Sequence, residues 1–147
     1  MSSRRSSATS SSEAVSPSQP FTNLRFAVAI EGVERTGAVE VVFPTARIVE
    51  RARSRSVQFD PLLIRRGLTE STEWFDWWDR ARRSARTRRR LVQVILLRSN
   101  GSEGLRWLFR DCRPTSYSLS PLHALVGEPV IESLQLQVAS FELYRRQ

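Results

Sequence analysis

Hydrophobic and polar residues alternate along much of the chain, and this pattern predicts β-strands. Near the start, hydrophobic side chains occupy every second position from residue 24 to 30, and again from 39 to 43. Gly32 and Gly37 lie between these two segments. Alternation with a period of two puts one set of side chains on each face of a strand. Two such segments around a glycine-containing turn predict a β-hairpin that is buried on one side.

The region from residue 46 to 66 is less regular. Residues 46–56 contain four arginines and little apolar material, which predicts a short strand followed by an exposed loop. Residues 57–66 read as extended, and Pro61 within them cannot donate a ladder hydrogen bond. Because proline in a sheet is confined to edges and bulges, an edge strand or a bulge is predicted here.

One helix is predicted after Gly67. Thr69 or Ser71 can cap its N-terminus, and the helix is expected to run to about Ala85. Four apolar residues at spacings of four, three and four form one stripe: Trp74, Trp78, Ala81 and Ala85. The residues expected to dock this helix on the core are its three tryptophans: Trp74, Trp77 and Trp78.

After residue 90 the chain again has β character. Except for Gln93, residues 91–97 are apolar on both alternating faces, which predicts a strand covered on both sides. Ser, Asn and Gly at 99–101 favour a hairpin turn into a returning strand at 105–109. Residues 114–129 read as a loop with short extended pieces, and one long strand is predicted at 130–143.

Together these elements predict a mainly β protein with one α-helix, an α+β fold. The expected architecture is an antiparallel β-sandwich or barrel with the amphipathic helix packed against it. Residues 21–147 would form this single domain. Residues 1–20 are mostly serine with little to bury, so a disordered N-terminal arm is predicted. No apolar run approaches the ~20 residues that cross a bilayer, so no membrane insertion is expected.

The charge pattern adds one strongly basic region. The chain carries a net charge of +8, and all 23 of its basic residues are arginine. Seven of these fall between residues 80 and 90: Arg80, Arg82, Arg83, Arg86, Arg88, Arg89 and Arg90. Such a cluster fits a solvated or subunit-contacting edge, and it also fits a module that binds the phosphates of nucleic acid.

Candidate catalytic and metal-binding residues are sparse. His123 is the only histidine and Cys112 the only cysteine, and no lysine follows a glycine-rich loop. The carboxylates of Glu73, Asp76 and Asp79 share one helix with neighbouring arginines, which favours ion pairing over a cation site. No catalytic, cofactor or metal site is predicted, and the chain is not expected to be an enzyme.

Several short motifs resemble, in the same order, those of a known family. Residues 62–69, LLIRRGLT, precede an aromatic cluster at Trp74–Trp78. Residues 24–42 resemble an opening hairpin, Phe109, Pro114 and Tyr117 a late strand-to-loop step, and residues 132–143 a closing strand. In this order the motifs resemble the tail-tube protein family of contractile phages and phage-like contractile injection systems.

The resemblance implies an assembly rather than a reaction. A β domain of tail-tube type would form hexameric rings that stack around a channel for DNA or protein cargo. Gln135 and Gln137 would then face the channel, and the arginines of residues 80–90 would contact the sheath or neighbouring subunits. Sheath and baseplate proteins would be the partners of the assembled rings. Assembly in the bacterial cytoplasm, as part of a virion tail or injection particle, would follow.

One interval departs from the family pattern. Family members usually carry a longer, glycine-rich basic loop before the Arg-Gly-Leu-Thr strand, and that loop takes part in contacts between stacked rings. In this chain only residues 51–56 fill the interval. A tube-initiating or terminal ring protein of the same fold is therefore an alternative to a subunit of the main tube.

Overall fold

Nine strands and one helix form the part of the chain that the computed structural model describes, residues 20–22, 25–33 and 37–145. The predicted N-terminal arm lies, apart from residue 20, outside these residues. In chain order the elements are β1 (Phe26–Ile30), β2 (Ala38–Val42), β3 (Ala46–Arg51), β4 (Ser54–Phe59), β5 (Leu62–Gly67), α1 (Glu73–Arg83), β6 (Arg90–Leu97), β7 (Glu103–Leu119), β8 (Ile131–Gln137) and β9 (Ser140–Leu143).

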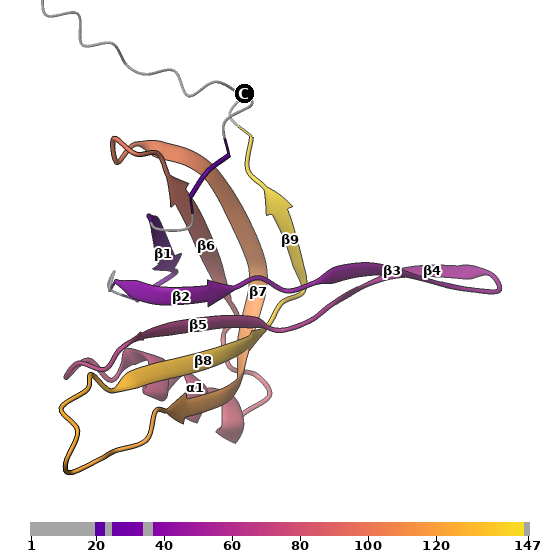
Figure 1. Cartoon of the computed structure of the whole chain (residues 1–147). Helices are drawn as coiled ribbons and strands as arrows, with labels where there is room; N and C mark the ends of the chain where they lie inside the picture. The colour runs from indigo at the N-terminus through magenta and orange to yellow at the C-terminus, as the bar shows by residue number, and fades with distance from the viewer. Residues whose placement is uncertain (1–19, 23–24, 34–36, 146–147) are drawn as a thin grey trace, which may run out of the picture.

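The body consists of two antiparallel sheets that share one long strand, β7. The strands follow the order β1-β6-β7-β8-β5-β2, and β9 also pairs with β7 (Figure 1). The first half of β7 pairs with β6 and β9, and residues 113–119 pair with β8. Between the two halves Asp111 has a positive φ of 53°, a conformation that aspartate tolerates better than most residues. The predicted α+β fold is confirmed, although the sheets do not close into a barrel.

The predicted hairpin of the first two strands is wrong. β1 pairs with β6, with Phe26 opposite Leu96, whereas β2 pairs with β5, with Val41 opposite Ile64. The two strands therefore belong to different sheets. Alternation identifies which face of a strand is buried, but it does not identify its partner.

A projecting hairpin replaces the loop that was predicted in the 46–56 region. β3 and β4 pair along their whole length, from Ala46 opposite Phe59 to Arg51 opposite Ser54. They form a separate two-stranded sheet that extends away from the body (Figure 1). Pro61 falls between β4 and β5, outside both ladders. We call residues 46–59 the arm.

The C-terminal half also differs from expectation. β7 continues to Leu119, so the predicted loop begins only at residue 120. The predicted long strand is divided into β8 and β9. It breaks because the bend of β7 separates the two sheets: β8 pairs with β7 beyond the bend and β9 before it. At the break, the amide of Ala139 donates to the carbonyl of Arg110 at 3.1 Å.

Helix α1 is shorter than predicted and begins at another residue. Its N-cap position is Thr72, whose hydroxyl donates to the Asp76 carboxylate at 2.8 Å. The Thr69 hydroxyl instead accepts from the amide of Ser71, within the preceding turn. The buried face consists of Trp74, Trp77 and Ala81. This stripe is rotated from the predicted one: Trp78 is half-buried, and Ala85 lies beyond the helix and is exposed.

The core lies between the two sheets and the helix. Its most deeply buried hydrophobic side chains come from five elements: Leu62, Ile64, Trp74, Trp77, Val92, Phe109, Leu134 and Leu136. Within the described residues, no helix is both long and apolar enough to cross a membrane.

Candidate assembly surfaces

The outer face of one sheet is polar. This sheet, which we call the four-stranded sheet, has the order β2-β5-β8-β7 and uses residues 113–119 of β7. In β8, Leu134 and Leu136 point into the core and are fully buried. Gln135 and Gln137 alternate with them and so lie on the outer face, where Gln135 is half-buried and Gln137 is exposed. The sequence-predicted glutamine pair therefore shares one solvent-facing surface.

Charged and hydroxyl groups continue this outer face across the neighbouring strands. On β5, Arg65 lies opposite Ser133 of β8, and its Nε donates to the serine hydroxyl at 3.2 Å. The same guanidinium contacts Glu40 of β2 at 3.1 Å. Because both charged groups are about half exposed, the pair contributes little stability. Its main effect is to keep the face hydrophilic across three strands.

Both edges of the four-stranded sheet are open in the part of the chain that the structure describes. β2 pairs only with β5, and residues 113–119 of β7 pair only with β8. An unpaired edge presents a row of backbone donors and acceptors to another strand. The amide of Ser120 donates to the carbonyl of Ile131 at 2.8 Å. Since donors alternate in direction along an antiparallel strand, the amide of Leu119 points to the free side.

The helix is joined to the four-stranded sheet by a buried ion pair that sequence reasoning missed. Arg66 of β5 contacts Glu132 of β8 at 2.7 Å, and both side chains are only 1% exposed. The Arg66 guanidinium also lies 4.2 Å from the centre of the Trp74 ring. The hydroxyl of Tyr117 donates to the second oxygen of Glu132 at 2.5 Å. Burial first, and then this carboxylate, raise the pKa of Tyr117 well above its usual value.

A sequence signal for this pair exists. Arg66 continues the inward positions of Leu62 and Ile64, and Glu132 precedes those of Leu134 and Leu136. A period of two therefore places both charges on buried faces. Charged side chains are rarely fully buried unless they are paired, so each position required a partner.

The three helix tryptophans differ in their surroundings. Trp74 and Trp77 are 2% and 1% exposed and belong to the core. Trp78 is half-buried and contacts the rings of Phe75 and Tyr117 at centroid distances of 5.9 and 6.1 Å. It joins the helix to the strand edge at Tyr117 rather than filling the centre of the core.

The arginines of residues 80–90 do not form a uniform patch. All are exposed except Arg90, which is half-buried. Arg82 and Arg83 contact Asp79 at 2.7 and 3.3 Å, and Arg88 contacts Glu31 at 2.5 Å. The guanidinium of Arg90 lies 5.0 Å from the centre of the Trp77 ring. Burial, followed by the positive charges of Arg80 and Arg88, lowers the pKa of Arg90.

Part of this basic region surrounds a groove of about 380 Å³. It is lined by Trp77, Arg80, Arg83, Ser84, Thr87, Arg88 and Arg90. Three of the four lining arginines are exposed, so the groove attracts anionic groups. Readers of single-stranded nucleic acid add exposed aromatic rings on which bases stack. Of the aromatic rings on the helix, Trp74 and Trp77 are buried. Phe75 is exposed and Trp78 half-buried, and both contact the ring of Tyr117 rather than standing free beside the groove.

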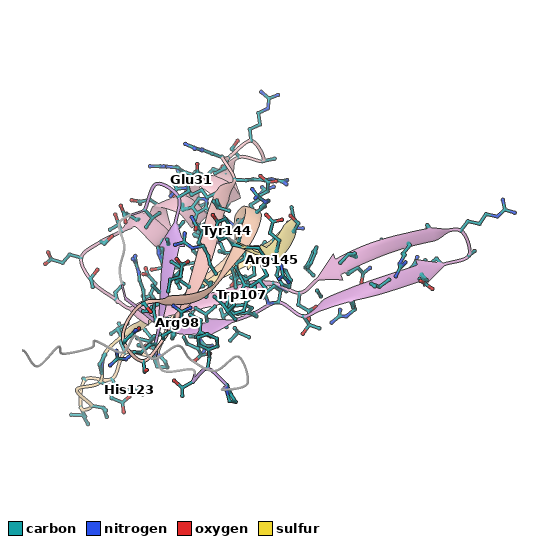
Figure 2. All side chains as sticks on the ribbon, turned by 90° about the horizontal axis from the view of Figure 1, so that it is seen from above. Glu31, Arg98, Trp107, His123, Tyr144 and Arg145 are labelled. Atoms are coloured by element: carbon teal, nitrogen blue, oxygen red, sulfur yellow. The ribbon has the colours of Figure 1, made fainter. Side chains whose placement is uncertain are left out.

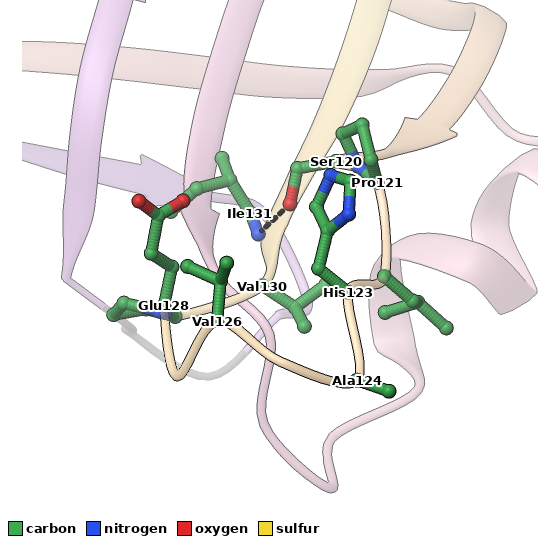
Figure 3. A pocket seen from close by; sticks show the side chains of 10 residues that line it. Ser120, Pro121, His123, Ala124, Val126, Glu128, Val130 and Ile131 are labelled. Atoms are coloured by element: carbon green, nitrogen blue, oxygen red, sulfur yellow. Dashed lines mark hydrogen bonds between the residues drawn. The ribbon is translucent and has the colours of Figure 1, made fainter.

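The loop at 120–130 holds the only histidine of the chain. Figure 3 shows His123 beside a hollow of about 650 Å³ that the loop encloses with the start of β8. The hydroxyl of Ser120 accepts from the amide of Ile131 at 2.8 Å and so closes the base of the loop. Among the described residues, no group of three or more histidine, cysteine or carboxylate side chains is placed to hold a metal ion.

Cys112 lies in the core and is fully buried. Burial raises the pKa of its thiol to about 12, and the thiolate is the reactive form. We expect the native protein to resist thiol reagents such as DTNB at pH 8, whereas unfolding in urea should release one reactive thiol per chain. Rapid labelling without denaturant, at an unchanged fold by circular dichroism, would contradict the observed packing around β7.

Both the sequence and the fold resemble those of known proteins. The sequence model of the T4-like virus tail tube protein gp19 matches residues 22–142. Comparison with curated protein sequences gives no match. Many solved structures share the fold at low sequence identity.

Two of these structures belong to an extracellular contractile injection system, and a third is the baseplate of the anti-feeding prophage. In a PVC sheath-tube complex of an extracellular contractile injection system, one chain is 16% identical with a TM-score of 0.69, covering 87% of this chain and 93% of its own. A chain of the PVC sheath/tube terminator is 17% identical with a TM-score of 0.70, and the match covers 88% of this chain and 100% of that chain. A chain of the anti-feeding prophage baseplate is 16% identical with a TM-score of 0.65, and the match covers 86% of this chain and 97% of that chain.

Proposed function

Because the chain belongs to the T4-like virus tail tube protein family, we propose that it is a structural subunit of the inner tube of a contractile phage tail or phage-like injection system. Copies would form hexameric rings that stack around a channel. The observation that carries this proposal is the four-stranded sheet, which has two open edges and a polar outer face. The role is structural and non-enzymatic.

The strand directions of the four-stranded sheet suit ring closure. Successive strands in the order β2-β5-β8-β7 are antiparallel, so β7 runs opposite to β2. All copies in a cyclic ring have the same orientation. The free edge of β7 in one copy would therefore meet β2 of the next in the antiparallel sense. A continuous sheet of this kind leaves no strand edge exposed around the ring.

The outer face of this sheet would then line the channel. Gln135 and Gln137 lie there together with Ser133 and the Arg65–Glu40 pair. Uncharged amides and hydroxyls bind water well and do not hold a passing DNA or protein cargo by charge. On the same strands the fully buried hydrophobic side chains face the core instead: Leu62, Ile64, Leu134 and Leu136.

The sheath and baseplate are the proposed outer partners. Helix α1 packs against the core-facing side of the four-stranded sheet, so its arginines lie on the side away from the proposed channel. The groove lined by Arg80, Arg83, Arg88 and Arg90 suits carboxylates of a surrounding protein. The particle itself would assemble in the bacterial cytoplasm.

A tube-initiating or terminal ring is the second candidate, because terminator and baseplate chains share this fold with similar TM-scores. Copy number distinguishes the two positions. In intact particles a main-tube subunit should outnumber the baseplate proteins many times, as measured by quantitative mass spectrometry. A terminal ring protein should be present at about the same level as the baseplate proteins.

The open edge of β7 provides a direct test of ring formation. Leu119→Pro removes the amide that points to the free side, whereas Leu119→Ala removes the same side chain but keeps the amide. Because neither change touches the ladder to β8, both should fold normally. In negative-stain microscopy of the concentrated full chain, we expect rings for the wild type and Leu119→Ala, and monomers for Leu119→Pro. Rings formed equally well by Leu119→Pro would contradict pairing at this edge.

A further inference from the structure

The groove beside the C-terminal end of α1, which we call the arginine groove, is lined by four arginines: Arg80, Arg83, Arg88 and Arg90. Its three other lining residues carry hydroxyl or indole groups, so no carboxylate lines it in the part of the chain that the structure describes. Its volume of about 380 Å³ lies in the range of small-ligand sites. Figure 2 shows Glu31, which contacts Arg88, on the side of the body away from the His123 loop and well apart from the arm. The arginine groove is therefore a separate surface.

Backbone oxygens at this end of α1 already have donors. The carbonyl of Arg80 accepts from the amide of Ser84 at 3.1 Å and from the hydroxyl of Thr87 at 2.9 Å. The carbonyl of Ala81 accepts from the guanidinium of Arg113 at 3.4 Å. The C-terminal end of a helix carries partial negative charge on its free carbonyl groups, which repels anions. Because these two carbonyls are occupied, the arginine side chains dominate the electrostatics of the groove.

Two of the four arginines have a carboxylate partner and two do not. Arg83 and Arg88 each contact a carboxylate, at 3.3 and 2.5 Å. Within the described residues, no carboxylate forms a salt bridge with Arg80 or Arg90. Arginine cannot shed its charge in a protein. The groove therefore keeps two positive charges that no salt bridge compensates.

Arg90 is held in place at the base of the groove. Its guanidinium lies 5.0 Å from the centre of the Trp77 ring, which is itself buried. Burial, and then repulsion by Arg80 and Arg88, lowers the pKa of Arg90. An anion between these side chains would relieve the repulsion. It would also meet a guanidinium that is already ordered, which reduces the entropy lost on binding.

From these observations we propose that the arginine groove binds a terminal phosphate group, such as orthophosphate or a phosphate monoester. A monoester carries a charge of about −1.5 to −2 at pH 7, which matches the two arginines without a salt bridge. Guanidinium groups bind phosphate oxygens through paired hydrogen bonds. A phosphodiester of the DNA backbone carries a single negative charge and neutralises only one of them. The site is complete within one chain, so it goes beyond the proposed function and does not depend on ring assembly.

Calorimetric titration of the full chain with glycerol phosphate, at constant ionic strength, tests the site. Arg80→Gln should weaken binding about tenfold, the effect expected when a hydrogen bond to a charged group is lost. Because Arg80 is exposed, the variant should keep its fold. Arg86→Gln is the matched control, since it removes the same charge from an exposed residue that does not line the groove. Equal weakening by the two variants would mean a diffuse basic surface and overturn the site.

A change of pH tests the charge of the ligand. The affinity for glycerol phosphate should fall severalfold from about pH 7.5 to about pH 5, because a phosphate monoester takes up a proton near pH 6. Sulfate keeps both charges over this range, so its affinity should not change in parallel. Titration of the nearby carboxylates of Glu31, Glu73 and Asp79 would affect both ligands alike. An equal pH dependence for the two ligands, or no binding of either glycerol phosphate or orthophosphate at low salt, would overturn the proposal.

Oligonucleotides distinguish the sources of the phosphate. If a 5′-phosphorylated oligonucleotide binds more tightly than its unphosphorylated counterpart, and Arg80→Gln removes the difference, the groove accepts the ends of nucleic acids. If the two bind equally weakly while glycerol phosphate binds, the ligand is a small free phosphate compound. An unphosphorylated oligonucleotide that binds as tightly as glycerol phosphate, and that Arg80→Gln weakens to the same extent, would overturn the preference for a terminal phosphate. None of these outcomes depends on whether rings form, so they leave the proposed function to its own test.

Discussion

Trp77→Ala is expected to lower the free energy of unfolding by about 3–5 kcal/mol, the usual cost of truncating a buried aromatic side chain to alanine. Trp77 is 1% exposed and is one of the largest fully buried side chains in the described residues. It lies where the helix meets the core between the two sheets. Removing the indole leaves a cavity that the surrounding strands cannot fill by small adjustments. Urea unfolding of the monomeric chain, followed by circular dichroism, measures the change.

Two matched variants show whether burial is the cause. Trp78→Ala removes the same side chain from a half-buried position on the same helix, so it should cost clearly less. Trp77→Phe keeps most of the ring and removes an indole N–H that finds no acceptor within the described structure, so it should cost less still. Equal losses at positions 77 and 78 would mean that the helix docks through its outer face.

Alternation along the chain predicted most strands and their buried faces. The inward positions of β8, Leu134 and Leu136, follow directly from the period of two, and so does the outward position of Gln135. The choice of partner strands did not follow, because β1 and β2 pair with strands far away in the sequence. Turn residues such as Gly32 indicate that the chain reverses, but they leave open which strand it meets.

For the surfaces too, the sequence predicted local features but not the contacts between distant residues. The arginine run was visible in the sequence, and the pairs of Arg82 and Arg83 with Asp79 follow from helical spacing. The contact of Arg88 with Glu31 spans distant positions and needs the fold. The arm was not predicted to be a β-hairpin, because its strands carry several arginines and the composition favoured a loop. That Gln135 and Gln137 line a channel stays a prediction until rings are examined.

The second large loss of stability is expected when the buried ion pair of Arg66 and Glu132 is broken. Glu132→Gln keeps the shape of the side chain but takes the negative charge away from a guanidinium that is 1% exposed. Removing one partner of a buried ion pair typically costs about 3–5 kcal/mol, because the remaining charge has no water to solvate it. The change also alters the acceptor of the Tyr117 hydroxyl. We expect a loss of this size in urea unfolding, together with a weaker attachment of α1 to the sheet.

The exposed pair on the opposite face of β5 is the matched control. Arg65 and Glu40 are also in contact, at 3.1 Å, but both are about half exposed, so Glu40→Gln should cost less than about 1 kcal/mol. The double change Arg66→Met with Glu132→Leu removes both buried charges and should recover most of the loss from Glu132→Gln, because buried ion pairs rarely outperform hydrophobic side chains of similar size. If the double variant is instead as unstable as Glu132→Gln, hydrophobic side chains of similar size cannot substitute for the ion pair. Its geometry would then be required to hold β5, β8 and α1 together.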